Sequence, residues 1–277
     1  MGEFLGTLGM AWPRLLVYPG GLFAIVAAWL VTRWLHWCAR IPWRTATFGT
    51  YQTLGSLLPP LVAISLLPLA PARPFPYGLD LFVALGLLEW PRMQQWLQQQ
   101  PTRSVLLQRY WPLLLAALGW AEAVGGVGLS RLLAWPEAPL NQALLLVSTA
   151  LWLSAVAPFG SHPGSRWNGA KAHWDAMSGY RLSAIGYWHW DSPALRLRTL
   201  GMLLIGSLPI LAALAAHFAA TLDPWAGWVL PCMAMLSATL LLGGLVRLPP
   251  QGLYLLQRGL ALGLVGVYGV REMMRYM

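Results

Sequence analysis

Two carboxylates inside apolar segments are the residues of this sequence best suited to chemistry. Glu89 lies in LGLLEWPRM and Glu122 in LGWAEAVGG. An ionisable group at membrane depth is costly and usually marks a functional position. Glu89 is close to a predicted helix end, where an ion pair with Arg92 is the simpler interpretation. Glu122 is predicted to lie deeper among small residues, which favours proton handling or a buried hydrogen bond to a neighbouring helix. The alternative for Glu122 is a carboxylate that reaches the interface beside the glycine-rich break at 125–128.

The polar stretch 158–193 holds the second group of candidate residues. It contains three histidines and two aspartates, namely His162, His173, His189, Asp175 and Asp191. Histidines near carboxylates can relay protons, so His173 and Asp175 join Glu89 and Glu122 as candidates for a proton path. The spacing of the histidines matches no metal-ligand motif, and the two cysteines are isolated. We therefore expect no metal site.

Motifs for nucleotide binding or nucleophilic catalysis are missing from the sequence. It contains no GxGxxG, P-loop, GxSxG or CxxC pattern, and each of these patterns supports a recognisable chemistry. We expect no catalytic residue and no cofactor bound by this chain alone. A nucleic-acid partner is also not expected, because the basic residues are spread over many loops rather than gathered on one face.

The elements that position these residues are predicted to be membrane helices. Of the 277 residues, 57% are hydrophobic and 10% are charged, whereas a soluble domain carries about 25% charged residues. Apolar runs of bilayer length recur along the chain, which predicts an all-α, polytopic integral membrane protein with one transmembrane domain over 1–277. The predicted helices span about 17–37, 54–71, 79–97, 106–130, 141–158, 199–221, 226–247 and 252–275.

Prolines and aspartates refine this assignment. Pro59, Pro60 and Pro68 interrupt the second predicted helix. Such a helix is tolerated where neighbouring helices satisfy the freed carbonyls, so we expect it to be buried. Asp80 and Asp223 fall at predicted helix starts, where a capping role is expected.

The basic residues indicate an orientation. Of the 18 lysines and arginines, five fall on one side, namely Arg14, Arg73, Arg131, Arg271 and Arg275. The others fall in or near the loops after the first, third, fifth and seventh predicted helices. The positive-inside rule then places 158–198 in the cytoplasm and both termini outside the inner, cytoplasmic membrane.

The 17 tryptophans have two interpretations. Many lie at predicted helix ends, as in the aromatic belts of membrane proteins. Trp167 and Trp174 lie instead in the polar stretch, where they are candidates for contact with a quinone, a lipid or a pigment.

The polar stretch resembles a known family. The sequence reads APFGSHP at 157–163 and DAMSGYRLSA at 175–184. Pro158-Phe159, Pro163, Ser178-Gly179 and Arg181 follow the order and spacing of the membrane protein that anchors the hydrophilic arm in bacterial respiratory complex I and in energy-converting membrane-bound NiFe hydrogenases. The segment RSVLLQRYWPLLLAAL at 103–118 is similar to a helix of the hydrogenase branch.

The resemblance implies a subunit of an oxidoreductase complex whose loop 158–198 docks a peripheral iron–sulfur or hydrogenase-like subunit. Iron–sulfur clusters, a quinone or a NiFe centre would belong to partner subunits, and other membrane subunits would surround this chain in the bilayer. The implied docking residues are Arg166, Lys171, Arg181, Arg196 and Arg198. The implied quinone or lipid contacts after the first helix are Trp43, Phe48 and Tyr51, in an interfacial segment.

The sequence departs from this family at its acidic positions. Leu153 and Gly160 replace family carboxylates, and the family's glutamate-rich stretch is the basic SRWNGAKAH. This favours anchoring over proton translocation. Two alternatives stay open: a stand-alone transporter or channel lined by Glu89 and Glu122, and a structural membrane subunit of another bioenergetic complex, such as a photosynthetic one.

Overall fold

The computed structural model describes residues 22–39, 54–67, 80–99, 103–156, 193–218, 220–221, 226–248 and 250–276. Its helices are α2 (Leu22–Ala39), α3 (Leu54–Ser65), α4 (Leu81–Gln99), α5 (Arg103–Val124), the short 3-10 helix η1 (Leu129–Leu133), α6 (Pro139–Val156), α8 (Pro193–Phe218), α9 (Ala226–Val246) and α10 (Pro250–Arg275). Across these ranges the chain forms helices and no strand. The predicted all-α class is therefore confirmed for the described residues.

Each predicted helix corresponds to one α-helix, but several boundaries differ. α3 ends at Ser65 rather than near 71, and α8 begins at Pro193 rather than near 199. α5 ends at Val124 rather than near 130. The reason is Gly125, whose φ of 69° lies in the left-handed region that glycine adopts readily and that ends helices.

Four of these helices are long and apolar enough to cross a membrane: α6, α8, α9 from Val229 and α10 from Gly252. α2, α3 and α5 contribute shorter apolar stretches, Phe23–Cys38, Gly55–Ser65 and Tyr110–Val124. The length and apolar composition of these helices are those of a helical membrane protein. Four of the eight predicted spans therefore meet this criterion of length and hydropathy among the described residues.

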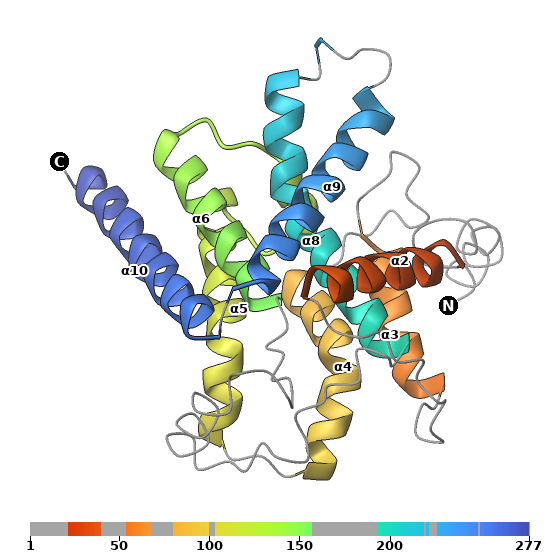
Figure 1. The fold of residues 1–277 in the computed structure, drawn as a ribbon. Coiled ribbons are helices and arrows are strands. Elements are labelled where there is room, and N and C mark those ends of the chain that lie inside the picture. Colours follow the sequence, from red (N-terminus) through yellow and green to blue (C-terminus); the bar gives the residue numbers. More distant parts are fainter. Residues whose placement is uncertain are drawn as a thin grey trace, which may run out of the picture.

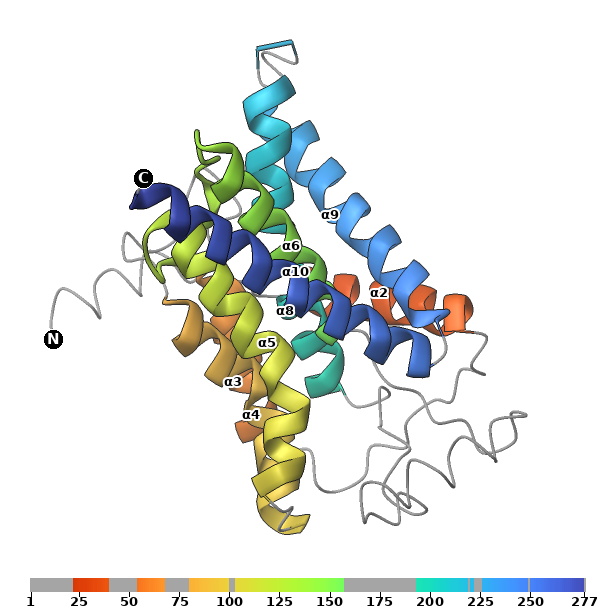
Figure 2. The ribbon, with the colours of Figure 1, turned by 90° about the vertical axis from the view of Figure 1, so that its left-hand side faces the viewer.

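α8 lies at the centre of the fold and packs against α2, α3, α4, α6, α9 and η1. Figures 1 and 2 show α2 lying across α8 and α9, with α10 on the opposite side of the molecule. Glycines allow α8 its close contacts. A Cβ added at Gly206 would lie 2.9 Å from Leu153 Cδ2 and 3.1 Å from Trp152 Cδ1 of α6.

Two tryptophans with hydrogen-bonded indole N–H groups lie at the centre of the core. Trp120 of α5 and Trp152 of α6 are fully buried, and their ring centroids are 4.7 Å apart. Trp120 Nε1 donates to Thr149 Oγ1 at 3.1 Å, and Trp152 Nε1 donates to the Met202 carbonyl oxygen at 2.9 Å. Buried indole N–H groups need such partners. These two tryptophans therefore tie α5, α6 and α8 together rather than forming part of an interfacial belt.

The start of α4 carries the predicted cap. The Phe82 N–H donates to Asp80 Oδ1 at 2.9 Å, which satisfies a backbone donor that has no partner within the helix. The Leu81 N–H donates to the Val127 carbonyl at 2.8 Å, so the chain after α5 also holds this helix end. The capping role of Asp80 is confirmed, whereas Asp223 lies outside the described residues.

Candidate functional site

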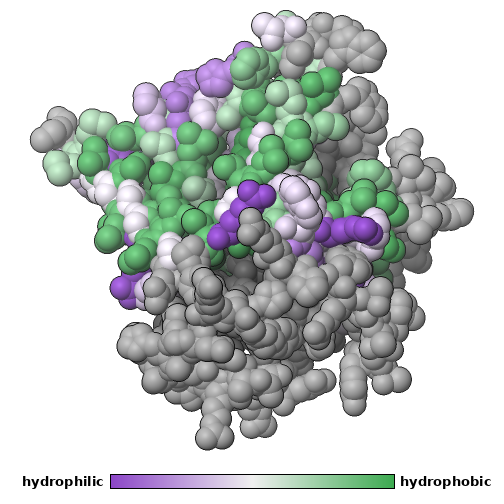
Figure 3. Space-filling view, in the orientation of Figure 1, coloured by the Kyte–Doolittle hydropathy of each residue, from purple (hydrophilic) through white to green (hydrophobic). Residues whose placement is uncertain are grey.

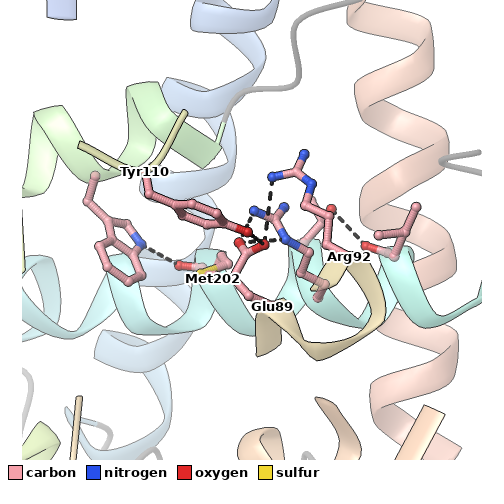
Figure 4. A network of polar contacts seen from close by, with 8 residues as sticks. Glu89, Arg92, Tyr110 and Met202 are labelled. Atoms are coloured by element: carbon pink, nitrogen blue, oxygen red, sulfur yellow. Dashed lines mark hydrogen bonds and ion pairs between the residues drawn. The ribbon is translucent and has the colours of Figure 1, made fainter. Parts of the chain in front are cut away.

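Glu89 is the centre of a buried polar cluster between three helices. It lies on α4 together with Arg92, while Tyr110 comes from α5 and Arg198 from α8 (Figure 4). Glu89 is 2% exposed and Arg198 is 3% exposed. A charged residue is almost never buried to this degree unless it is paired.

Both oxygens of the Glu89 carboxylate are occupied. Arg198 Nε donates to Glu89 Oε1 at 2.8 Å, and Arg198 Nη2 donates to the same oxygen. The Tyr110 hydroxyl donates to Oε2 at 2.9 Å, and Arg92 Nη1 lies 3.7 Å from Oε2. Charge-assisted hydrogen bonds of this kind are the stronger ones in proteins. The arrangement holds three helices in register, because each donor comes from a fixed position on its helix.

Local sequence explains how the cluster forms. Glu89 and Arg92 are three residues apart on α4, which places them on one helix face. Leu88, next to Glu89, packs against Gly201, which follows Arg198 by three residues on α8. A Cβ at Gly201 would lie 3.1 Å from Leu88 Cδ1 and 3.2 Å from Ile64 Cγ1. The missing side chain at 201 therefore lets α3 and α4 approach α8 where the ion pair forms.

Glu122 lies in a different environment from the one predicted. Its side chain is 49% exposed, because α5 ends two residues later. Arg271 of α10 places Nη2 at 3.3 Å from Glu122 Oε2, and its Nη1 donates to the Glu122 carbonyl at 3.2 Å. The expected partner on a neighbouring helix is thus confirmed, but the prediction that Glu122 is the deeper carboxylate is wrong. Glu89 has that place.

Arg198 also differs from its predicted role. It was expected to face carboxylates on a partner subunit, but it is buried in α8 and pairs with Glu89 of the same chain. The cause is the earlier start of α8 at Pro193, which places residue 198 inside the helix. Arg196 is half-buried in the first turn of α8. The other predicted docking residues, Arg166, Lys171 and Arg181, lie outside the described residues.

The remaining predicted site residues also lie outside the described ranges. They are His173, Asp175, Trp43, Phe48, Tyr51, Trp167 and Trp174. Within the described ranges, no group of three histidine, cysteine, aspartate or glutamate residues is arranged to hold a metal ion.

Tyr110 and the inward role of Arg198 were missed at the sequence level. A signal for them does exist. Glu89 and Tyr110 lie in helices predicted to end or begin on the cytoplasmic side, and Arg198 lies immediately before the predicted start of another such helix at residue 199. Lone polar residues at the same depth of neighbouring helices tend to pair, since an unpaired one is costly there.

Comparison with known proteins found no matching family model, no matching curated protein and no matching solved structure. The fold and the site define a class only: a helical membrane-type protein with a buried Glu–Arg cluster at the base of its central helix.

Proposed function

We propose that this chain is the membrane-anchoring subunit of an oxidoreductase complex of the complex I or NiFe hydrogenase type, and that the segment between α6 and α8, residues 158–192, docks its peripheral redox subunit. The observation that carries the proposal is the way in which both ends of that segment are held. α6 ends at Val156 and α8 begins at Pro193. A buried polar side chain from another helix fastens each of these ends.

At the first end, the chain compensates for a proline. The carbonyl of Ser154 would accept a helical hydrogen bond from residue 158, but Pro158 has no N–H. Gln257 of α10 is buried and its Nε2 donates to this carbonyl at 3.1 Å. An unpaired buried carbonyl costs about 1–3 kcal/mol, so this side chain supports the end of α6.

At the second end, the Glu89–Arg198 pair fixes the second turn of α8 to α4, and Tyr110 adds α5. A docking segment benefits from ends that are already fixed. If the partner had to order those ends on binding, the lost conformational entropy would weaken the affinity. The segment itself is basic, with Arg166, Lys171 and Arg181, so carboxylates on the peripheral subunit are the expected counterpart.

The proposed topology has eight spans in the inner membrane with both termini outside. Three contacts support the alternation of helix ends that this topology requires. Glu89–Arg198 and Cys38–Arg247 join residues that the basic-residue pattern places on the cytoplasmic side, whereas Glu122–Arg271 joins two that it places outside. An error in the number of spans between two paired residues would place them at opposite ends of the bundle.

Quinone, iron–sulfur clusters or a NiFe centre would be held at or by partner subunits. Proton translocation by this chain has less support than anchoring, since Glu122 is half-exposed and Glu89 is engaged by Arg198 and Tyr110. The same two facts weaken the transporter alternative, in which these carboxylates would line a path.

Purification from native membranes in mild detergent tests the proposal. We expect a complex with co-purifying subunits and iron–sulfur or flavin absorbance. Replacing Arg166, Lys171 and Arg181 together by glutamate should release the peripheral subunit when membranes are washed, because like charges would then face each other. The control is Arg275→Glu, on the predicted outer side. A 30.5 kDa chain that purifies alone or only with copies of itself would contradict the proposal, as would full retention in the triple variant.

A further inference from the structure

The end of α2 packs against the end of α9 through two residue pairs, Trp34 with Gly243 and Cys38 with Arg247. The Trp34 ring lies against Gly243, where a Cβ would overlap it. One turn later, Arg247 Nη2 lies 3.9 Å from Cys38 Sγ. Because residues 34 and 38, like 243 and 247, are one turn apart, the two helix ends are held side by side. Arg247 thereby contacts Cys38, which follows Trp37 in the sequence, and Arg33 lies one turn before Trp37 on the exposed side of α2.

This part of the surface is basic, and the described residues provide no carboxylate that pairs with it. Arg33 and Arg247 are exposed, and in the described part of the chain neither forms an ion pair with a carboxylate. The Arg33 guanidinium lies 5.2 Å from the centroid of the Trp29 ring. The sequence contains no aspartate or glutamate from 4 to 79 or from 224 to 271. The charge must therefore be balanced from outside these segments.

The surroundings of the two arginines are apolar and exposed. Trp37 is 71% exposed, and Leu30, Leu240 and Leu241 are exposed on the same two helices. Figure 3 shows hydrophilic patches next to hydrophobic surface over α2 and around the junction of α9 with α10. Cations with no carboxylate partner among the described residues, beside a wide apolar surface, suit a ligand that has an anionic head and hydrocarbon chains.

We propose that Arg33, Trp37 and Arg247 bind the headgroup of an anionic phospholipid at the cytoplasmic side of the membrane. The two guanidiniums donate to the phosphate oxygens. The Trp37 ring lies at the headgroup level, where tryptophan is favoured, and the acyl chains lie along the exposed leucines of α2 and α9. A free phosphate would leave the apolar surface unused, and a zwitterionic lipid would leave the positive charge uncompensated.

Lipid binding to the full-length protein in detergent tests this directly, by native mass spectrometry and by the shift in melting temperature. The probes are dioleoyl phosphatidylglycerol, dioleoyl phosphatidylcholine and inorganic phosphate. We expect phosphatidylglycerol alone to bind tightly and to raise the melting temperature. A basic residue near a lipid surface contributes about 1 kcal/mol. Arg33→Gln and Arg247→Gln should therefore each weaken binding about fivefold, and the double variant about thirtyfold.

Arg275→Gln is the matched control, since Arg275 is exposed on α10 but pairs with Glu272 at 3.0 Å. It should retain the preference for phosphatidylglycerol. The melting temperature in phosphatidylcholine reports whether the double variant is folded. A folded double variant that keeps the preference would overturn the proposal. Equal loss in Arg275→Gln, or equal stabilisation by inorganic phosphate, would also overturn it.

Discussion

At the scale of single residues, the carboxylates of Glu89 and Glu122 have opposite roles. Glu89 is enclosed by Arg198, Tyr110 and Arg92 from three helices, whereas Glu122 pairs with Arg271 at a half-exposed helix end. The energetic consequences differ accordingly. Breaking a buried ion pair leaves an uncompensated charge in a poorly solvated site, while an exposed pair contributes little.

Glu89→Gln should destabilise the protein by about 3–5 kcal/mol, because the buried guanidinium of Arg198 and the partly buried one of Arg92 would then face a neutral amide. Glu122→Gln is the matched control and should cost no more than about 1 kcal/mol. Unfolding by titration with a denaturing detergent measures both free energies. Equal losses in the two variants would contradict the burial of Glu89. In the proposed complex, we also expect Glu122→Gln to leave electron transfer intact, and loss of proton pumping with preserved turnover would make Glu122 a coupling residue.

At the scale of helices, α8 organises the fold because small residues let its neighbours approach. Leu88 and Ile64 lie against Gly201, and Trp152 and Leu153 lie against Gly206. α10 provides the contrast. It packs mainly on α6 and α5, and four of its glycines, at 259, 263, 266 and 269, have open space where a side chain would be.

Gly201→Ala should therefore destabilise the protein by about 1–3 kcal/mol, since the new Cβ would overlap the Leu88 side chain and displace α4 from α8. Gly266→Ala makes the same change where nothing lies within 4 Å, and it should be neutral or stabilising by up to about 1 kcal/mol through helix propensity. Melting temperatures of the two purified variants give the comparison. A Gly201→Ala variant as stable as the Gly266→Ala variant would show that the α4–α8 contact is looser than described.

At the scale of the whole molecule, the pairs Cys38–Arg247 and Glu122–Arg271 mark two opposite ends of the bundle. Among the described residues, Arg33, Arg92, Arg198 and Arg247 are basic residues that the sequence pattern assigns to the end marked by Cys38–Arg247. Figures 1 and 2 show α4 and α5 extending on this side past the turn that joins α9 to α10. A bundle with one basic end is what the positive-inside rule produces when a polytopic chain inserts.

Cysteine labelling checks this orientation. In a Cys38→Ser, Cys232→Ser background, single cysteines at Ser165 and Ala72 should label from opposite sides, with Ser165 accessible from the cytoplasm. A membrane-impermeant maleimide applied to sealed, oriented vesicles makes the measurement, and permeabilised vesicles confirm that both positions react. Labelling of both positions from one side would refute the topology and, with it, the proposed docking of a cytoplasmic subunit.

The sequence alone determined the helical class, the order of the eight α-helices in the described residues and the cap at Asp80, because hydropathy and capping depend on residues close together in the chain. Tertiary structure decided which carboxylate is buried. Glu89 and Arg198 are 109 positions apart, and no local pattern brings them together. Their meeting depends on the gap that Gly201 leaves for α4 and on the start of α8 at Pro193. Likewise, the depth of Glu122 was set by Gly125, whose left-handed backbone ended α5 sooner than hydropathy predicts. Helix formation is a sum of local preferences, whereas the pairing of charges is a property of the packed assembly.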